Sequence, residues 1–250
     1  MTGSSPELPM AAAPAEAATP LRPLWARSLA LVTSPRSVFE ELERRPAWAW
    51  TAVVISLFAL VVGYLIYEPV IFPFILEQAE KQNLSSQALA QAEQLYASPA
   101  FKFFTSFSGG AANFAFVVIT GLLLYAVCTF LLGGRARVRQ SLAVAAHAML
   151  VHIPRSILVL PVMWARQDPY VSLGPGALFP PGEAEGFLAK ALATFLGSLD
   201  LFNLWALALC VLGMSVVSRL SAKQVGVAVV IGYLVLSALM ALGGAALQPR

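Results

Sequence analysis

Charged residues are scarce in this chain of 250 residues: Asp, Glu, Lys and Arg together make up 12% of it, whereas hydrophobic residues make up 58%. Soluble domains carry about a quarter charged residues, so this composition excludes an ordinary water-soluble fold. The net charge of +3 is no sign of a nucleic-acid partner, because in membrane proteins the placement of basic residues matters more than their sum. We predict a polytopic membrane protein that lies in the lipid bilayer.

Cysteine and histidine are also rare, with two of each. Cys128 and Cys210 both lie within apolar runs and have no CxxC spacing, so we expect small core residues rather than a disulfide framework or a metal site. The chain has no HExxH, GxSxG, P-loop or GxGxxG motif. We therefore expect no metal, no cofactor and no catalytic residues, and a protein that is not an enzyme.

The chain divides into three parts by composition. Residues 1–22 are rich in Ala, Pro and Ser and lack the basic start of a secretory signal, so we predict a disordered tail. Residues 23–46 are predicted to form a cytoplasmic amphipathic or interfacial segment. Residues 47–248 are predicted to form an all-α transmembrane domain.

Five apolar stretches in that domain are long enough to cross a bilayer, which takes about 20 residues. We predict the spans at 48–67, 107–133, 140–164, 190–217 and 224–247. Pro154 and Pro161 predict a kink in the third span. Residues 76–98, rich in Gln, Ala and Glu, predict an external helix or helical hairpin between the first two spans.

Basic residues predict the orientation of the bundle. Ten Lys and Arg residues fall on one side of the predicted spans, against five on the other. The short loops "GGRARVRQ" and "SRLSAK" are the most informative, because short loops obey the positive-inside rule best. We predict a cytoplasmic amino terminus and a carboxyl terminus on the outside of a cell inner membrane, which agrees with an odd number of spans.

The segment "SPRSVFEELERRP" begins with a helix-start pattern, Ser34 followed by Pro35. Its apolar residues share one face, and apolar residues upstream of it could extend that face along the inner membrane surface. The alternative is an ordinary helix packed on the bundle. We expect this segment to contact a cytosolic or membrane protein partner, through Trp25, Pro35, Arg36, Phe39 and Leu42.

Two charges are predicted to lie at similar depth in consecutive spans. Asp200 follows Lys190 by ten residues, and Arg155 precedes Trp164 by nine. At 1.5 Å per residue these separations correspond to about 15 Å and about 14 Å from the same surface. Unpaired charges at that depth are costly, so we predict an ion pair or a shared polar network between Asp200 and Arg155.

We expect this network to include Asn203, on the same helical face as Asp200, and His152, three residues before Arg155. Structural specification of helix packing is its expected function. A proton path through Asp200, His152 and His147 is the alternative.

Two stretches resemble the Yip domain family. They are "SPRSVFEELERRPAW" before the first span and "GSLDLFNLWALALCVLGMSVVSRLSAKQ" leading into the last. The matching positions are Pro35, Arg36 and Phe39, then Asp200, Phe202, Trp205 and Gly213. The resemblance implies a five-span bundle with a cytoplasmic amino terminus. Eukaryotic relatives bind Rab-type GTPases, but the short amino-terminal arm here lacks their Gly/Tyr-rich motifs. The abundance of Ala, and of Arg over Lys, indicates a bacterial member.

Together these features predict a non-catalytic membrane protein that acts as a scaffold or as a partner-binding, membrane-organising protein. The alternative is a small-solute or proton-coupled transporter or channel that uses Asp200 and Arg155. The sequence does not specify the oligomeric state.

Overall fold

The computed structural model describes residues 21–82, 84–179, 184 and 186–247, so the predicted tail lies outside it except for Leu21 and Arg22. All regular structure in that part of the chain is helical. The α-helices are α1 (Leu24–Thr33), α2 (Pro35–Arg44), α3 (Ala49–Ile66), α4 (Phe72–Lys81), α5 (Ser86–Tyr96), α6 (Pro99–Tyr125), α7 (Val138–Ala148), α8 (His152–Arg166), α9 (Phe187–Ser198), α10 (Leu201–Ser218) and α11 (Ala222–Leu247). Shorter turns are η1 (Tyr67–Ile71), η2 (Ala126–Leu131), η3 (Met149–Val151) and η4 (Pro175–Leu178).

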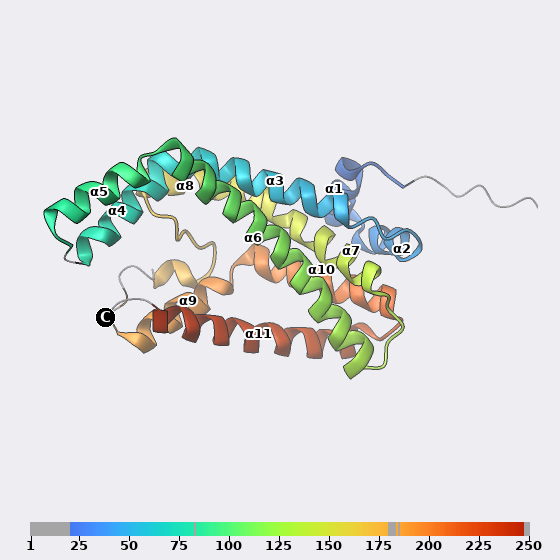
Figure 1. Cartoon of the computed structure of the whole chain (residues 1–250). Coiled ribbons are helices and arrows are strands. Elements are labelled where there is room, and N and C mark those ends of the chain that lie inside the picture. Colours follow the sequence, from blue (N-terminus) through green and yellow to red (C-terminus); the bar gives the residue numbers. More distant parts are fainter. Residues whose placement is uncertain (1–20, 83, 180–183, 185, 248–250) are drawn as a thin grey trace, which may run out of the picture.

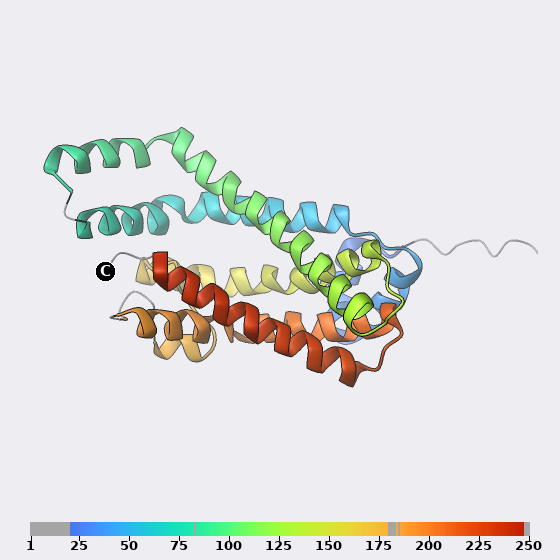
Figure 2. The same cartoon turned by 60° about the horizontal axis from the view of Figure 1, so that its bottom comes forward.

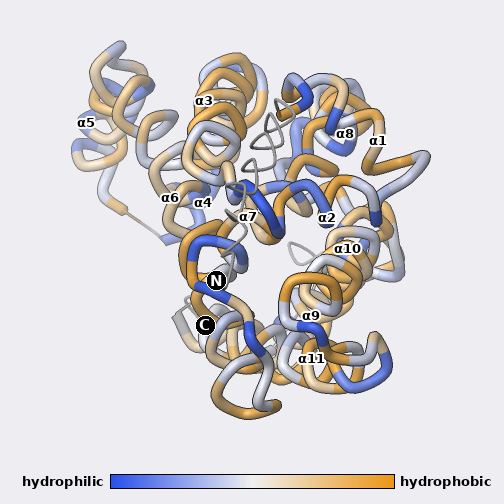
Figure 3. The backbone as a smooth tube through the Cα atoms, turned by 90° about the vertical axis from the view of Figure 1, so that its right-hand side faces the viewer, coloured by the Kyte–Doolittle hydropathy of each residue, from blue (hydrophilic) through white to orange (hydrophobic). Residues whose placement is uncertain are grey.

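Five helical stretches are long and apolar enough to cross a membrane, which confirms the predicted all-α, five-helix architecture. They are Ala49–Lys81, Pro99–Leu131, Val138–Arg166, Leu201–Ser218 and Ala222–Ala246. Long helices such as α3 and α10 are hydrophobic over much of their length (Figure 3). Many large apolar side chains point outward from them, which water would disfavour and a lipid bilayer favours.

The third stretch, α7 to α8, is the most enclosed of the five. Helix α7 packs against α3, α6, α10 and α2. Its buried alanines, such as Ala143 and Ala146, let the neighbouring backbones approach closely. Where the prolines predict a kink, the structure has the 3-10 turn η3, which ends three residues before Pro154.

The first stretch continues beyond the position where we expect it to end. At Glu68-Pro69 the helix widens into the π-helical turn η1 and then continues as α4. Proline has no N–H to donate, and a π turn is a common way for a helix to absorb such an irregularity. Helices α4 and α5 form a hairpin that projects beyond the bundle, at the end opposite α1 and α2 (Figures 1 and 2).

The expected fourth span, 190–217, is two helices in the structure. Helix α9 ends at Ser198 and α10 starts at Leu201, so the chain breaks at Leu199 and Asp200. Helix α9 packs beside α11, and α10 packs against α2, α7 and α11. A break inside a membrane bundle leaves backbone groups without helical partners, and other parts of the protein must satisfy them.

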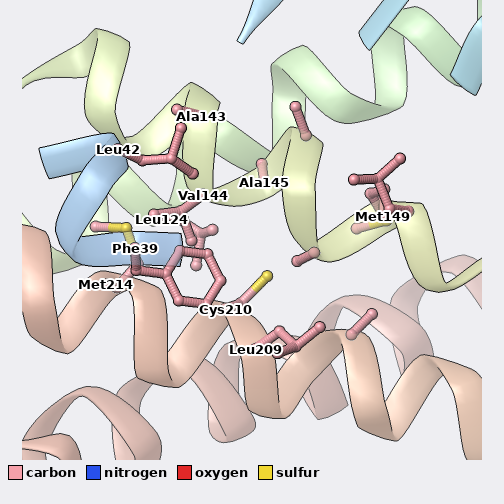
Figure 4. Packing of buried hydrophobic residues seen from close by; sticks show 14 of the residues in the cluster. Phe39, Leu42, Leu124, Ala143, Val144, Ala145, Met149, Leu209, Cys210 and Met214 are labelled. Carbon is pink, nitrogen blue, oxygen red and sulfur yellow. The ribbon is translucent and has the colours of Figure 1, made fainter. Parts of the chain in front are cut away.

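Helix α2 is part of the hydrophobic core of the bundle and is not only a segment at its surface. Phe39 and Leu42 are fully buried between α7 and α10, beside Val144 and Met214 (Figure 4). A Cβ added to Gly213 would lie 2.8 Å from the Phe39 ring and 2.7 Å from a Val144 methyl group. Glycine at position 213 therefore makes the space that the phenylalanine ring fills.

We predict that Phe39→Ala destabilises the whole bundle. It removes a fully buried ring and leaves a cavity, which costs about 3–5 kcal/mol of unfolding free energy. Thermal unfolding of the purified protein in detergent should show a clearly lower Tm. The control is Arg36→Ala on the same helix, which breaks only an exposed pair with Glu40 and should cost no more than about 1 kcal/mol. Equal Tm values for the two variants would show that α2 is not part of the core.

Candidate functional site

The carboxylate of Asp200 is the centre of the polar network at the break. Its Oδ1 accepts a hydrogen bond from the backbone N–H of Phe202 at 2.8 Å, so the residue caps α10. Its Oδ2 accepts from the backbone N–H of Leu173 at 3.0 Å and from Nε of Arg155 at 3.3 Å. The Asp200 side chain is fully buried, whereas that of Arg155 is 28% exposed.

The loop before η4 folds back against this break. The Arg155 guanidinium also donates from Nη2 to the carbonyl of Val171 at 3.3 Å, so it holds the loop from a second point. Glycines allow the backbones to meet. A Cβ on Gly174 would lie 2.6 Å from the Leu199 carbonyl oxygen, and one on Gly176 would lie 2.5 Å from the Cα of Gly197. Side chains at these two positions would force the loop away from Asp200.

This geometry explains why Asp200 and Arg155 lie inside the bundle, and the explanation needs no chemical reaction at the site. The carboxylate receives three donors from three parts of the chain, which compensates the cost of burying it. It satisfies the N–H of Phe202 at the start of α10 and one N–H of the loop, groups that the broken helix would otherwise leave unpaired. The arrangement supports a structural function for the pair.

The structure pairs Asp200 with Arg155. Within the described residues, the side chains of the other two predicted network residues, Asn203 and His152, make no hydrogen bond to this pair. Asn203 donates from Nδ2 to the carbonyl of Ser198 at 3.0 Å, so it closes the end of α9 rather than contacting the pair. His152 begins α8, and its carbonyl accepts from Ser156. Within the described residues, the His152 imidazole makes no hydrogen bond.

A second buried polar cluster joins α1 to the bundle. Nη1 of Arg27 lies 2.7 Å from Nε2 of His147, and Oγ1 of Thr51 lies 3.4 Å from the same nitrogen. Nδ1 of His147 lies 2.8 Å from the Ala143 carbonyl, so the geometry fits a neutral imidazole that donates there and accepts from arginine. Burial lowers the pKa of Arg27, an effect that the nearby Glu41 carboxylate opposes.

Sequence reasoning did not identify Arg27 as a buried residue. A signal was present, because Leu24, Arg27 and Leu31 share one helical face and Leu31 is 2% exposed. The contribution of Leu173 to the Asp200 site could not be found in this way, because the contact uses only its backbone N–H. The glycines of "LGPGAL" were the available hint of close backbone approach.

The five residues proposed for the amino-terminal interaction segment have different surroundings. Phe39 and Leu42 are buried in the core. Pro35 is the first residue of α2 and is half-buried, and Arg36 is exposed and paired with Glu40. Trp25 is 72% exposed on α1. Within the described residues, no three His, Cys, Asp or Glu side chains gather as a metal site.

We predict unequal effects from removing the two partners of the buried pair. Asp200→Ala removes three acceptor contacts and leaves Arg155 unpaired, at a cost of about 3–5 kcal/mol of unfolding free energy. Arg155→Met should cost less, about 1–3 kcal/mol, because Asp200 keeps its two backbone donors. Thermal unfolding of both single variants and the double variant measures this difference. Equal costs for the two single variants would contradict the capping function of Asp200.

Comparison with protein families identifies a matching domain family. The family model of the Yip1 domain matches residues 29–245, which include α2, the break at Asp200, the first four long apolar stretches and the fifth up to residue 245. No curated protein and no solved structure matches the chain. The family match covers most of the chain and includes both stretches that resemble the family at the level of motifs. The chain therefore belongs to the Yip1 domain family.

Proposed function

We propose that this protein is a non-catalytic membrane scaffold that binds a protein partner through the exposed face of α1. The observation that carries the proposal is an apolar stripe on that helix. Trp25, Leu29 and Val32 are 72%, 62% and 61% exposed and follow one another at helical spacing. An exposed aromatic anchor flanked by aliphatic side chains is typical of a binding surface.

The opposite face of α1 makes this stripe a fixed surface. Arg27, Ala30 and Leu31 are buried, and Arg27 reaches His147 within the bundle. Arg22 adds contacts to α2. Its Nε forms an ion pair of 2.7 Å with Glu41, its backbone N–H donates to the same carboxylate at 2.7 Å, and its Nη2 donates to Ser37 at 3.3 Å. Helix α1 is thus held at one angle, which lowers the entropic cost of binding.

We place α1 on the cytoplasmic side of a bacterial inner membrane. The basic loops between η2 and α7 and between α10 and α11 lie at the same end as α1 and α2, and the positive-inside rule favours that end for the cytoplasm (Figure 1). The α4–α5 hairpin then projects on the outside, as a second surface for a partner.

A transporter that uses Asp200 and Arg155 is not favoured by any observation. Both oxygens of the buried carboxylate are engaged by donors of the protein itself. A transported solute or proton would have to displace these bonds and the loop they hold.

Site-specific photo-crosslinking in intact membranes tests the partner surface. We predict that a photoreactive phenylalanine at position 29 gives a discrete protein adduct. The same residue at position 57, on the apolar face of α3 with 53% exposure, should give lipid adducts only. Trp25→Glu should reduce the adduct at position 29 by about tenfold or more, because it removes an aromatic anchor. Arg36→Gln should not. Lipid adducts alone at position 29 would show that α1 lies against the bilayer and would overturn the proposal.

Cysteine accessibility in whole cells tests the orientation. The native Cys128 and Cys210 are buried, so their labelling should be low. We predict that a membrane-impermeant maleimide labels Ser86→Cys, at the start of α5, in intact cells. Ser221→Cys, between α10 and α11, should be labelled only after the membrane is permeabilised. The reverse pattern would place α1 outside the cell.

A further inference from the structure

Four arginines and one glutamate surround a hollow at the end of the bundle where α2, α7 and α10 meet. The cavity has a volume of about 520 Å³ and is lined by Glu43, Arg44, Arg135, Arg137, Gln140, Val217 and Arg219. These residues come from three separate parts of the chain: the end of α2, the loop into α7 with the first turn of that helix, and the end of α10. None of them belongs to the Asp200 site or to the exposed face of α1.

Positive charge in this hollow is only partly balanced. Arg219 pairs with Glu43, with an Nη2–Oε1 distance of 3.2 Å. Within the described residues, the guanidinium groups of Arg44, Arg135 and Arg137 make no ion pair and no hydrogen bond. Gathering like charges raises the energy of the empty site, and an anion in the hollow would lower it. Guanidinium groups match phosphate oxygens in charge and in bidentate geometry.

Hydrogen bonds fix the segments that carry these arginines, whose side chains are exposed at the surface. Gln140 donates from Nε2 to the Glu43 carbonyl at 2.8 Å, which ties α7 to the end of α2. The N–H of Arg135 donates to the Ser218 carbonyl at 3.0 Å, which ties the loop to α10. Arg219 itself has a φ of 59°, a left-handed conformation that is uncommon outside glycine.

The surroundings of the hollow place it at the height of lipid headgroups. It lies beside one end of each of three membrane-crossing stretches. Two of them end here, at Leu131 and Ser218, and the third begins here, at Val138. Phe130 and Leu131, directly before the arginine loop, are 77% and 74% exposed, as side chains in contact with acyl chains would be. A phosphate carried on a lipid would reach this position with its chains beside these residues.

We propose that this arginine pocket binds a phosphate monoester group, such as the headgroup of phosphatidic acid. The positive-inside rule explains why arginines occur in these loops, but it does not require them to converge on one cavity. Arg139 gives the comparison within the same segment, because it is exposed as Arg137 is but does not line the hollow. Binding that depended on diffuse charge would use Arg139 as much as Arg137.

The test measures ligand binding to the purified full-length protein in uncharged detergent. The probes are a short-chain phosphatidic acid, the matching phosphatidylcholine, glycerol 3-phosphate and inorganic phosphate. We expect saturable binding of phosphatidic acid, weakened about tenfold or more by Arg135→Gln or Arg137→Gln, since each removes a charged hydrogen-bond donor. Arg139→Gln should leave binding within about twofold. Glu43→Gln should tighten binding several-fold, because it removes the competing carboxylate and frees Arg219.

The remaining outcomes separate the sources of the phosphate. Binding of glycerol 3-phosphate or inorganic phosphate with the same dependence on Arg137 supports the pocket and assigns it to a soluble phosphate compound. Equal loss in the Arg137→Gln and Arg139→Gln variants, or equal binding of phosphatidylcholine, overturns the proposal. Melting curves without ligand check that each variant is folded, and Glu43→Gln keeps the test decisive, because misfolding would not strengthen binding.

Discussion

The bundle depends on one constraint, which is that backbone N–H and C=O groups inside a membrane must find partners within the protein. The helix expected for the fourth crossing is interrupted at Leu199 and Asp200, directly before the apolar stretch Leu201–Ser218, and the Asp200 carboxylate accepts a hydrogen bond from an N–H at the start of α10. Its second oxygen accepts from the loop before η4 and from Arg155, so one side chain fixes two helices and a loop. Net stability from such a buried pair is often small, but the pair penalises arrangements in which either charge is left alone.

Hydropathy in the sequence was sufficient to predict the five long apolar helices of the architecture. Apolar runs of bilayer length mark the long helices because the membrane imposes that length. Equal depth in consecutive antiparallel spans identified Asp200 and Arg155 as neighbours, since depth follows from helical rise alone. The break at Asp200 was not visible in this way. An aspartate beside Ser198 and Leu199 fits both a continuous helix facing a polar seam and a helix cap, and only the loop that contacts it decides between them.

The burial of α2 in the bundle could not be predicted from the sequence either. The spacing of Val38, Phe39 and Leu42 predicts an apolar face, but it does not say whether lipid, a partner or the bundle covers that face. The matching feature is Gly213, some 170 residues later, whose missing side chain admits the Phe39 ring. Complementarity of this kind is a property of two distant positions together. The arginine pocket is similar, because its three parts are brought together only by the packing of α2, α7 and α10.

Arg155 and Asp200 are 45 residues apart in the chain, and this separation bears on how the protein is made. Arg155 belongs to the third crossing and is synthesised before Asp200. Chains grow at about 5–20 residues per second, so about 2–9 s pass before the aspartate is synthesised. An arginine near the centre of a crossing costs about 2.5–3.5 kcal/mol during insertion. The apolar residues of the third crossing therefore have to offset this cost until the fourth crossing arrives.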